Sequence, residues 1–250
     1  RRKRLRENIT DVAEPTDRLA IFLHIVARSA IFVPTKNEQT MIKNVIFDFG
    51  GVIAHFVREG AVRRFEQLGL KDANEQLDNY CQNGIFLEVE KGAISAEGFR
   101  ERLSEMCGRE VSYEEARWAW LGFFTETPTS KLDYISALRP RYRTYVLSNT
   151  NPYIMSWARS GELSEQGRPL DDYFDAIFTS YELGTVKPEK RFFEHVLAAT
   201  RSLPSETVFV DDGPHNVAAA EAMGIHTLCP ANGEDWREAL TELLDRLNRE

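Results

Sequence analysis

The stretch VIFDFGGV, residues 45–52, decides how this chain folds. Its first three residues are apolar and favour a buried strand, which ends at the carboxylate of Asp48. Two glycines follow, and they allow the backbone to turn sharply and to approach a ligand closely. Open parallel sheets bind their ligands at the carboxyl ends of their strands. The stretch therefore predicts an α/β protein with a parallel sheet and with Asp48 at its functional edge.

Three later segments also place polar side chains at or just beyond the ends of apolar runs. The segments are VLSNT (146–150), GTVKPEKRFF (184–193) and VFVDDGPHN (208–216). They contribute the hydroxyl of Ser148, the ammonium group of Lys187 and the carboxylates of Asp211 and Asp212. Each residue alone also fits a turn or a helix cap. The four segments in this order predict a nucleophile, a phosphate-binding site and a cation site at one edge of the sheet.

Asp48 is the predicted nucleophile. An ionised carboxylate can attack phosphorus and form an acyl phosphate, which water then hydrolyses. Phosphoryl transfer also requires neutralisation of charge, and carboxylate and carbonyl oxygens are the ligands that Mg²⁺ prefers. We expect Asp48, Asp212 and the backbone carbonyl of Gly50 to hold Mg²⁺, with Asp211 as a nearby or water-mediated partner.

The remaining polar residues are predicted to bind the substrate or to orient the others. Ser148 and Lys187 would hold the phosphate group. Asn149 and Asn151 directly follow the serine, so they would either contact the substrate or cap the next helix. Asn216 lies about one turn into the helix after the acidic pair, where it would orient Asp212 or Lys187.

A helical block interrupts the sheet pattern after its first strand. Helical patterns cover residues 61–68, 72–83 and 95–107, and another begins with a capping box at residue 112. No convincing strand lies between His55 and Pro128. We expect residues 41–55 and 129–250 to form the sheet domain, and residues 56–128 to form a small inserted helical domain.

After this block, strands alternate with helices. Strands are predicted at residues 143–147, 176–179, 207–210 and 225–228, and helices at 131–138, 189–200, 216–223 and 235–248. This alternation predicts a doubly wound parallel sheet with right-handed crossovers.

The four motifs resemble those of the haloacid dehalogenase (HAD) superfamily, over residues 43 to about 229. The resemblance implies a Rossmann-like, three-layer core, a small helical cap, and Mg²⁺-dependent phosphatase activity. It also implies the roles of nucleophile for Asp48, of phosphate ligands for Ser148 and Lys187, and of main metal carboxylate for Asp212. Within the superfamily, the sequence looks most like bacterial α-D-glucose-1-phosphate phosphatases, which favours a sugar phosphate as substrate.

The sequence departs from the phosphatase pattern at Gly50, where most members have a second aspartate that acts as general acid and base. Three explanations stay open: a substrate whose leaving group departs easily, a substitute acid such as His55, or a weakened enzyme retained for binding a phosphorylated metabolite. His55 also fits the role of a hinge residue without catalytic function. Glu88 and Glu90 are predicted to be solvated surface residues.

A 2-haloacid dehalogenase is the alternative enzyme class within the superfamily. Such enzymes also lack the second aspartate and use no metal. The adjacent carboxylates of Asp211 and Asp212 argue against this activity, because without a cation they would repel an anionic substrate.

Composition limits the possible partners. The chain has 250 residues and a net charge of −8, which argues against binding to the phosphate backbone of nucleic acids. Its three cysteines, Cys81, Cys107 and Cys229, show no metal-binding spacing and are predicted to be free thiols. We expect a cytoplasmic monomer or homodimer that acts on a small phosphorylated metabolite and does not bind membranes.

Residues 1–40 differ from the rest of the sequence. A basic start and a short apolar run at residues 19–27 superficially resemble a secretory signal. The run is interrupted by His24 and closely followed by Arg28, so we favour a poorly ordered extension ahead of a domain that starts at Met41.

Overall fold

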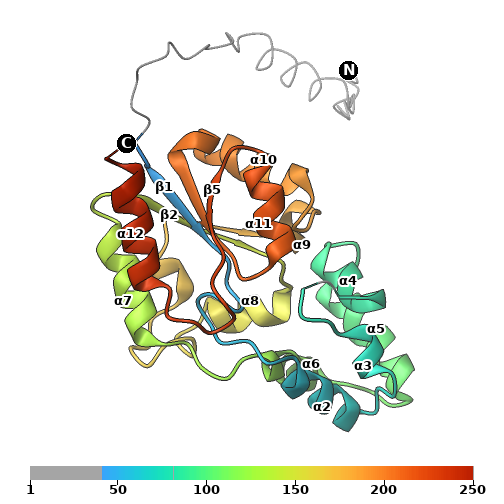
Figure 1. Cartoon of the computed structure of the whole chain (residues 1–250). Coiled ribbons are helices and arrows are strands. Elements are labelled where there is room, and N and C mark those ends of the chain that lie inside the picture. The colour runs from blue at the N-terminus through green and yellow to red at the C-terminus, as the bar shows by residue number, and fades with distance from the viewer. Residues whose placement is uncertain (1–40, 81, 250) are drawn as a thin grey trace, which may run out of the picture. The chain divides into compact units, whose positions relative to one another are not determined.

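The computed structural model describes residues 41–80 and 82–249 (Figure 1). The expectations for residues 1–40 and for the thiol of Cys81 lie outside these described residues. Cys107 and Cys229 are free cysteines, as predicted. Among the described residues, no helix is long and apolar enough to cross a membrane.

A five-stranded parallel sheet forms the centre of the fold, in the order β3-β2-β1-β4-β5. The strands are β1 (Asn44–Phe47), β2 (Arg143–Ser148), β3 (Ala176–Thr179), β4 (Thr207–Val210) and β5 (His226–Leu228). The chain leaves β1 for β2 on one side and later returns to β4 on the other. The predicted parallel α/β fold is therefore confirmed, and β1 lies where the strand order reverses direction.

Alternating side chains of β1 point to opposite faces of the sheet and create two hydrophobic clusters. Val45 and Phe47 belong to the larger cluster, which includes residues of α7 (Thr129–Leu138) and α12 (Arg237–Leu247). Ile46 belongs to the smaller cluster, which is formed with residues of α10 (Lys190–Thr200) and α11 (Pro214–Glu221). Figure 1 shows these helices on the two sides of the sheet, which gives the predicted three layers.

The segment between β1 and β2 is helical. It contains α2 (Arg58–Leu68), α3 (Ala73–Gln76), α4 (Gly84–Glu90), α5 (Ala96–Cys107), α6 (Tyr113–Trp120) and the 3₁₀ turn η1 (Leu121–Phe123). The prediction of one helix over 72–83 is wrong, because among the described residues of this range only the four of α3 are helical. The helix α4 was not predicted from the sequence. We call residues 56–128 the inserted segment.

Local signals in the inserted segment fix the ends of two helices as predicted. Ser95 caps α5 by accepting a hydrogen bond from the Gly98 N–H, and Gly108 ends that helix with φ of 68°. Ser112 and Glu115 form the capping box of α6. Four mutually packed aromatic side chains then join the helices into one core: Phe65, Phe86, Phe99 and Trp120.

The inserted segment is bonded to the sheet domain at several places. The Tyr153 hydroxyl of α8 (Pro152–Ala158) donates to the Ala96 carbonyl at 2.6 Å. An ion pair joins Lys91 to Glu189 at 3.0 Å, and α4 also packs near α9 (Ser180–Leu183). Two further 3₁₀ turns, η2 (Leu170–Asp172) and η3 (Pro204–Glu206), complete the sheet domain.

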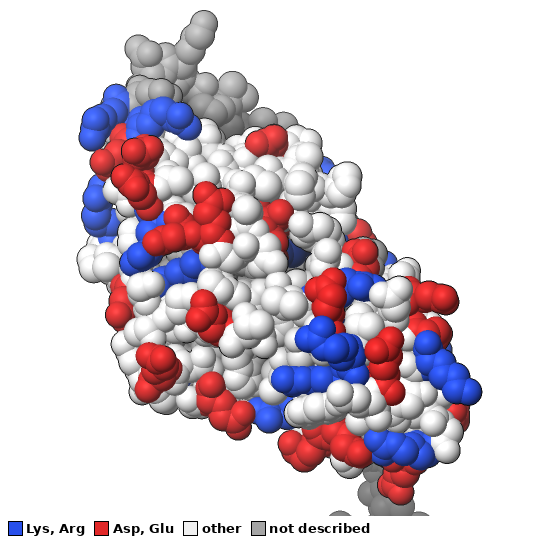
Figure 2. Space-filling view, turned by 60° about the horizontal axis from the view of Figure 1, so that its bottom comes forward, with Lys and Arg blue, Asp and Glu red and all other residues white. Residues whose placement is uncertain are grey.

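Charged side chains of both signs are interspersed on the face of the molecule shown in Figure 2. Several form ion pairs, including Arg102 with Glu88 at 2.6 Å and Arg117 with Glu162 at 2.7 Å. Such exposed pairs contribute little to stability, so the packing of the apolar clusters dominates it.

Candidate active site

The predicted site residues meet because β1 and β4 end at the same level and the parallel strand β2 extends only two residues further. In the sheet register, Phe47 of β1 lies opposite Val146 of β2 and Val210 of β4. Asp48 and Asp211 directly follow the ends of β1 and β4, and Ser148 is the last residue of β2. The side chains therefore gather at the carboxyl edge where the strand order reverses, which is where such sheets bind ligands.

Lys187 lies between two of the aspartates. Its Nζ is 2.7 Å from Asp48 Oδ1 and 2.7 Å from Asp211 Oδ2, and its side chain is 1% exposed. Burial lowers the pKa of Lys187, but the charges of Asp211 and Asp48 outweigh burial and raise the pKa above its ordinary value. Lys187 is therefore a fixed positive charge next to Asp48.

Asp211 is fully buried and holds Lys187 in place. Its Oδ1 accepts hydrogen bonds from the Gly213 N–H at 2.8 Å and from Asn216 Nδ2 at 3.0 Å. The prediction that Asn216 orients Asp212 or Lys187 is therefore corrected, since its amide donates to Asp211. Both oxygens of Asp211 have partners, whereas Asp212 faces the pocket.

The two asparagines after Ser148 use their amides within the protein. Asn149 donates to the Lys187 carbonyl at 3.0 Å and accepts from the Lys187 N–H at 2.7 Å, although it also lines the pocket. Asn151 caps α8 by accepting from the N–H groups of Tyr153 and Ile154. Of the two alternatives for Asn151, the structure thus shows helix capping.

The glycine turn after Asp48 leaves room for the acidic pair. Gly51 has φ of 79°, and a Cβ atom built there would overlap the Asp212 carboxylate. A Cβ atom at Gly50 would lie 3.2 Å from Cδ2 of Phe56, so an aromatic ring occupies the space beside that position. The first glycine borders the pocket, and the second permits the approach of Asp212.

Three carboxylates at this edge suit a cation. Ligand oxygens of Asp48, Asp211 and Asp212 lie within 4.8 Å of one another. Burial and the charges of the neighbouring carboxylates raise the pKa of Asp48 to about 7 and that of Asp212 to about 6, although the charge of Lys187 opposes both shifts. A bound cation would relieve the mutual repulsion that contributes to these shifts and would favour the ionised forms. The set of hard oxygen ligands fits Mg²⁺.

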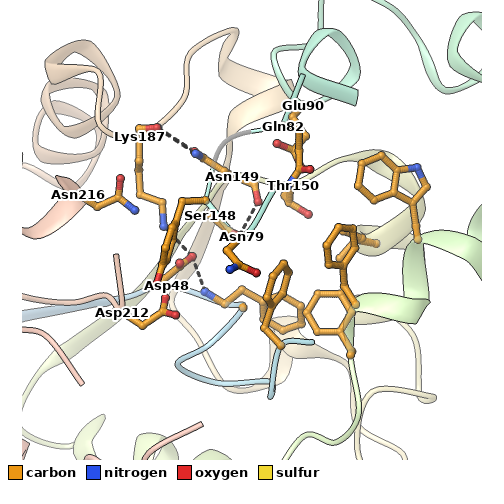
Figure 3. A pocket seen from close by; sticks show the side chains of 18 residues that line it. Asp48, Asn79, Gln82, Glu90, Ser148, Asn149, Thr150, Lys187, Asp212 and Asn216 are labelled. Atoms are coloured by element: carbon orange, nitrogen blue, oxygen red, sulfur yellow. Dashed lines mark hydrogen bonds and ion pairs between the residues drawn. The ribbon is translucent and has the colours of Figure 1, made fainter. Parts of the chain in front are cut away.

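A pocket opens above these groups and is lined by both the sheet domain and the inserted segment (Figure 3). The inserted segment provides the polar residues Asn79, Tyr80, Gln82 and Glu90. An aromatic wall comprises Phe49, Phe56, Trp120, Phe123 and Phe124. The sheet domain adds Thr150, whose buried Oγ1 has no hydrogen-bond partner among the described residues. This second set of polar residues was not predicted from the sequence.

Glu90 contradicts its prediction as a solvated residue. It is 5% exposed, because it lies one helical turn after the buried Phe86 on the same face of α4. Burial and then the charge of Asp48 raise the pKa of Glu90 to about 8, against the opposing charge of Lys187. Glu88 does lie on the outer face, where it pairs with Arg102. The spacing from Phe86 was the only sequence signal for this difference.

His55, the candidate substitute acid, is engaged elsewhere. Its Nδ1 lies 2.8 Å from Glu126 Oε1, and it is not among the residues that line the pocket. Among the described residues, His55 thus pairs with Glu126 near the end of the inserted segment, and no hydrogen bond or ion pair joins it to Asp48.

Sequence comparison places this site in a known family. A family model described as haloacid dehalogenase-like hydrolase matches residues 42–224. The chain belongs to this family. The hydrolase is 51% identical over 205 residues to a D-ribitol-5-phosphate phosphatase from Bacteroides thetaiotaomicron, covering 82% of this chain and all of that protein.

Solved structures of other family members have the same fold. A HAD-like hydrolase from Porphyromonas gingivalis is 46% identical, with a TM-score of 0.78 over 82% of this chain and 98% of the other. A HAD family enzyme from Bacteroides thetaiotaomicron, solved with magnesium and inorganic phosphate, is 36% identical, with a TM-score of 0.73 over 79% and 98% of the two chains.

Proposed function

We propose that this hydrolase is a Mg²⁺-dependent phosphatase that cleaves a small phosphate monoester, with the phosphate esters of sugars and sugar alcohols as the favoured class. The observation that carries the proposal is the placement of Asp48 next to Lys187 and Asp212 at the carboxyl edge of the sheet, facing a polar pocket. The D-ribitol-5-phosphate phosphatase relative and the magnesium and phosphate complex support it.

In the proposed reaction, a carboxylate oxygen of Asp48 attacks phosphorus and forms an aspartyl phosphate. Ser148 and Lys187 hold the non-bridging phosphate oxygens. Both residues are almost fully buried and line the same pocket as Asp48. Asn149 positions Lys187, because its side-chain amide donates to the Lys187 carbonyl and accepts from the Lys187 N–H.

Mg²⁺ would be held by Asp48, Asp212 and the backbone carbonyl of Gly50. When bound, it supplies the positive charge that offsets the negative charge of the phosphate group. Asp211 has its oxygens occupied by Lys187, Gly213 and Asn216, so its role is to position the lysine and to add negative charge near the cation.

We infer that the inserted segment, residues 56–128, acts as a cap that selects the substrate. It provides amide, phenol and carboxyl groups to the pocket, and all of the aromatic wall except Phe49. Hydroxyl groups of a sugar or polyol need polar partners of this kind, and the aromatic wall would cover the carbon chain. We propose that the enzyme acts in the cytoplasm, as a monomer or homodimer.

Haloacid dehalogenation is the less favoured alternative. Asp48, Asp211 and Asp212 place three carboxylates close together, and a haloacid would bring a further negative charge without the cation that a phosphatase uses. A binding protein without turnover is the third possibility and is separated by the same experiment.

The test is phosphate release from a panel of sugar phosphates, polyol phosphates, nucleotides and an activated aryl phosphate. Release should require Mg²⁺, stop with a chelator, and fall at least about 10³-fold in Asp48→Asn, since the nucleophile is lost. Asp245→Asn is the matched control, because Asp245 lies on α12 and pairs only with Arg249 among the described residues. Absence of release from every compound would refute the phosphatase, and tight phosphate binding without release would support the binding protein.

A further inference from the structure

The proposed reaction needs a proton donor for its leaving group. A sugar or polyol leaves as an alkoxide, which is a poor leaving group until it receives a proton. Gly50 has no side chain to supply one. Among the described residues, those that line the pocket and can titrate are Asp48, Tyr80, Glu90, Lys187 and Asp212.

Four of these five residues are poorly suited to protonate the leaving oxygen. Asp48 attacks phosphorus, and Asp212 lies beside it on the attacking side. Lys187 is held by two carboxylates that favour its charged form. Burial, followed by the charge of Asp212, raises the pKa of Tyr80 above its ordinary range, which makes the phenol a weaker acid.

Glu90 lies on the side of the pocket where we expect the leaving group to depart. In an in-line displacement, the leaving oxygen lies opposite the attacking oxygen. In the view of Figure 3, Glu90 lies across the pocket from Asp48 and Asp212. Its side chain lines the pocket, and no other described residue forms a hydrogen bond or ion pair with its carboxyl group. The carboxyl group can therefore donate a hydrogen bond to a ligand in the pocket, or accept one from it.

We propose that Glu90, at the end of α4 in the inserted segment, is the general acid and base of this phosphatase, and that it replaces the acid missing at Gly50. This inference rests on the proposed function. The raised pKa of Glu90 is consistent with it, because burial keeps the carboxyl group protonated, and thus able to donate, at neutral pH.

Contacts with the sheet domain fix the position of Glu90. The next residue, Lys91, forms an ion pair at 3.0 Å with Glu189, which lies two residues after Lys187 in the sequence. Gly92 follows with φ of 64°, and a Cβ atom there would overlap the Tyr181 carbonyl oxygen. The end of α4 is therefore in direct contact with the sheet domain, which supports a fixed distance between Glu90 and the strand edge.

Glu90 serves both chemical steps, because it donates a proton in the first and accepts one in the second. In the first, the Asp48–phosphorus bond forms, the bond from phosphorus to the leaving oxygen breaks, and that oxygen takes the proton of Glu90. In the second, water attacks phosphorus, its proton passes to the Glu90 carboxylate, and the Asp48–phosphorus bond breaks. Phosphate and alcohol are released, and Asp48 and Glu90 return to their starting states.

The test compares two leaving groups in the isosteric variant Glu90→Gln. With an alkyl substrate such as ribitol 5-phosphate, we expect kcat to fall about 10²–10⁴-fold. With 4-nitrophenyl phosphate, the leaving group needs no proton, so a rapid burst of nitrophenol equal to the enzyme concentration should precede slow turnover. Glu88→Gln removes a carboxylate from the outer face of the same helix and should keep the wild-type rates.

A second variant distinguishes the loss of the carboxyl group from a change in structure. Glu90→Asp keeps a carboxyl group on a shorter chain, so it should retain more alkyl phosphatase activity than Glu90→Gln while showing the same dependence on the leaving group. An equal loss of the burst and of alkyl turnover, or a rise in KM at unchanged kcat, would overturn the proposal and assign Glu90 to packing or substrate binding. Wild-type activity that survives Asp48→Asn would instead refute the proposed function.

Discussion

The buried carboxyl group of Glu90 should make the stability of the protein depend on pH. Its pKa is about 8 in the folded protein, compared with an ordinary value of 4.5. Below pH 4.5 the group is neutral in both the folded and the unfolded state, and it has no effect. Between pH 4.5 and 8 it ionises only in the unfolded state, so the free energy of unfolding falls as the pH rises.

The size of this effect follows from the two pKa values. One pH unit corresponds to about 1.4 kcal/mol, so Glu90 should lower the free energy of unfolding by about 2 kcal/mol at pH 6. At pH 8 and above, the loss approaches a limit of about 5 kcal/mol. Glu90→Gln has the same shape but no titration, and the cost of burying its amide does not change with pH.

Urea unfolding between pH 5 and 8.5, without divalent cations, would measure this effect. The stability of Glu90→Gln relative to the wild type should increase steadily with pH, while Glu88→Gln should follow the wild type across this range. Only the slope is diagnostic, since the buried amide adds a constant offset. A difference that stays the same from pH 5 to 8.5 would refute the assignment of a buried, neutral carboxyl group.

Two further variants test the strand edge. Gly51→Ala forces the Asp212 carboxylate to move, so Mg²⁺ affinity measured by calorimetry should fall about 10–100-fold. The positive φ of residue 51 should also cost about 1–2 kcal/mol of stability in this variant. Unchanged Mg²⁺ affinity would contradict the role of Asp212. Lys187→Met removes the ammonium group that lies between Asp48 and Asp211, so the free energy of unfolding measured in urea should fall by about 3–5 kcal/mol. Added Mg²⁺ should restore part of the lost stability. An unchanged free energy of unfolding would show that the aspartates are protonated.

The sheet and its edge could be predicted because their signals are local. An apolar run followed by a polar residue identifies a strand end, and parallel strands bring their ends together whatever the details of packing. The same holds for the capping box at Ser112, which lies within four consecutive residues. These features require no knowledge of what the rest of the chain contacts.

The residues that the inserted segment adds to the site could not be predicted in the same way. The helix α4 has seven residues and packs near α9, which lies about ninety residues later, so its formation depends on tertiary contacts. Glu88 and Glu90 look alike in the sequence, and only packing makes one exposed and the other buried. The sequence also could not show that Asn216 bonds to Asp211 and not to Asp212, because the two aspartates are adjacent.

The contact between Gly92 and the Tyr181 carbonyl limits how this enzyme could be re-engineered for another substrate. Because the backbone of α4 ends against the sheet domain with no space for a side chain, a chimera that exchanges the whole inserted segment must keep a glycine at this junction. Grafts confined to the loop that carries Asn79 and Tyr80 avoid the junction altogether. Substrate preference can thus be varied in one part of the pocket while Glu90, the group proposed for proton transfer, keeps its position relative to Asp48.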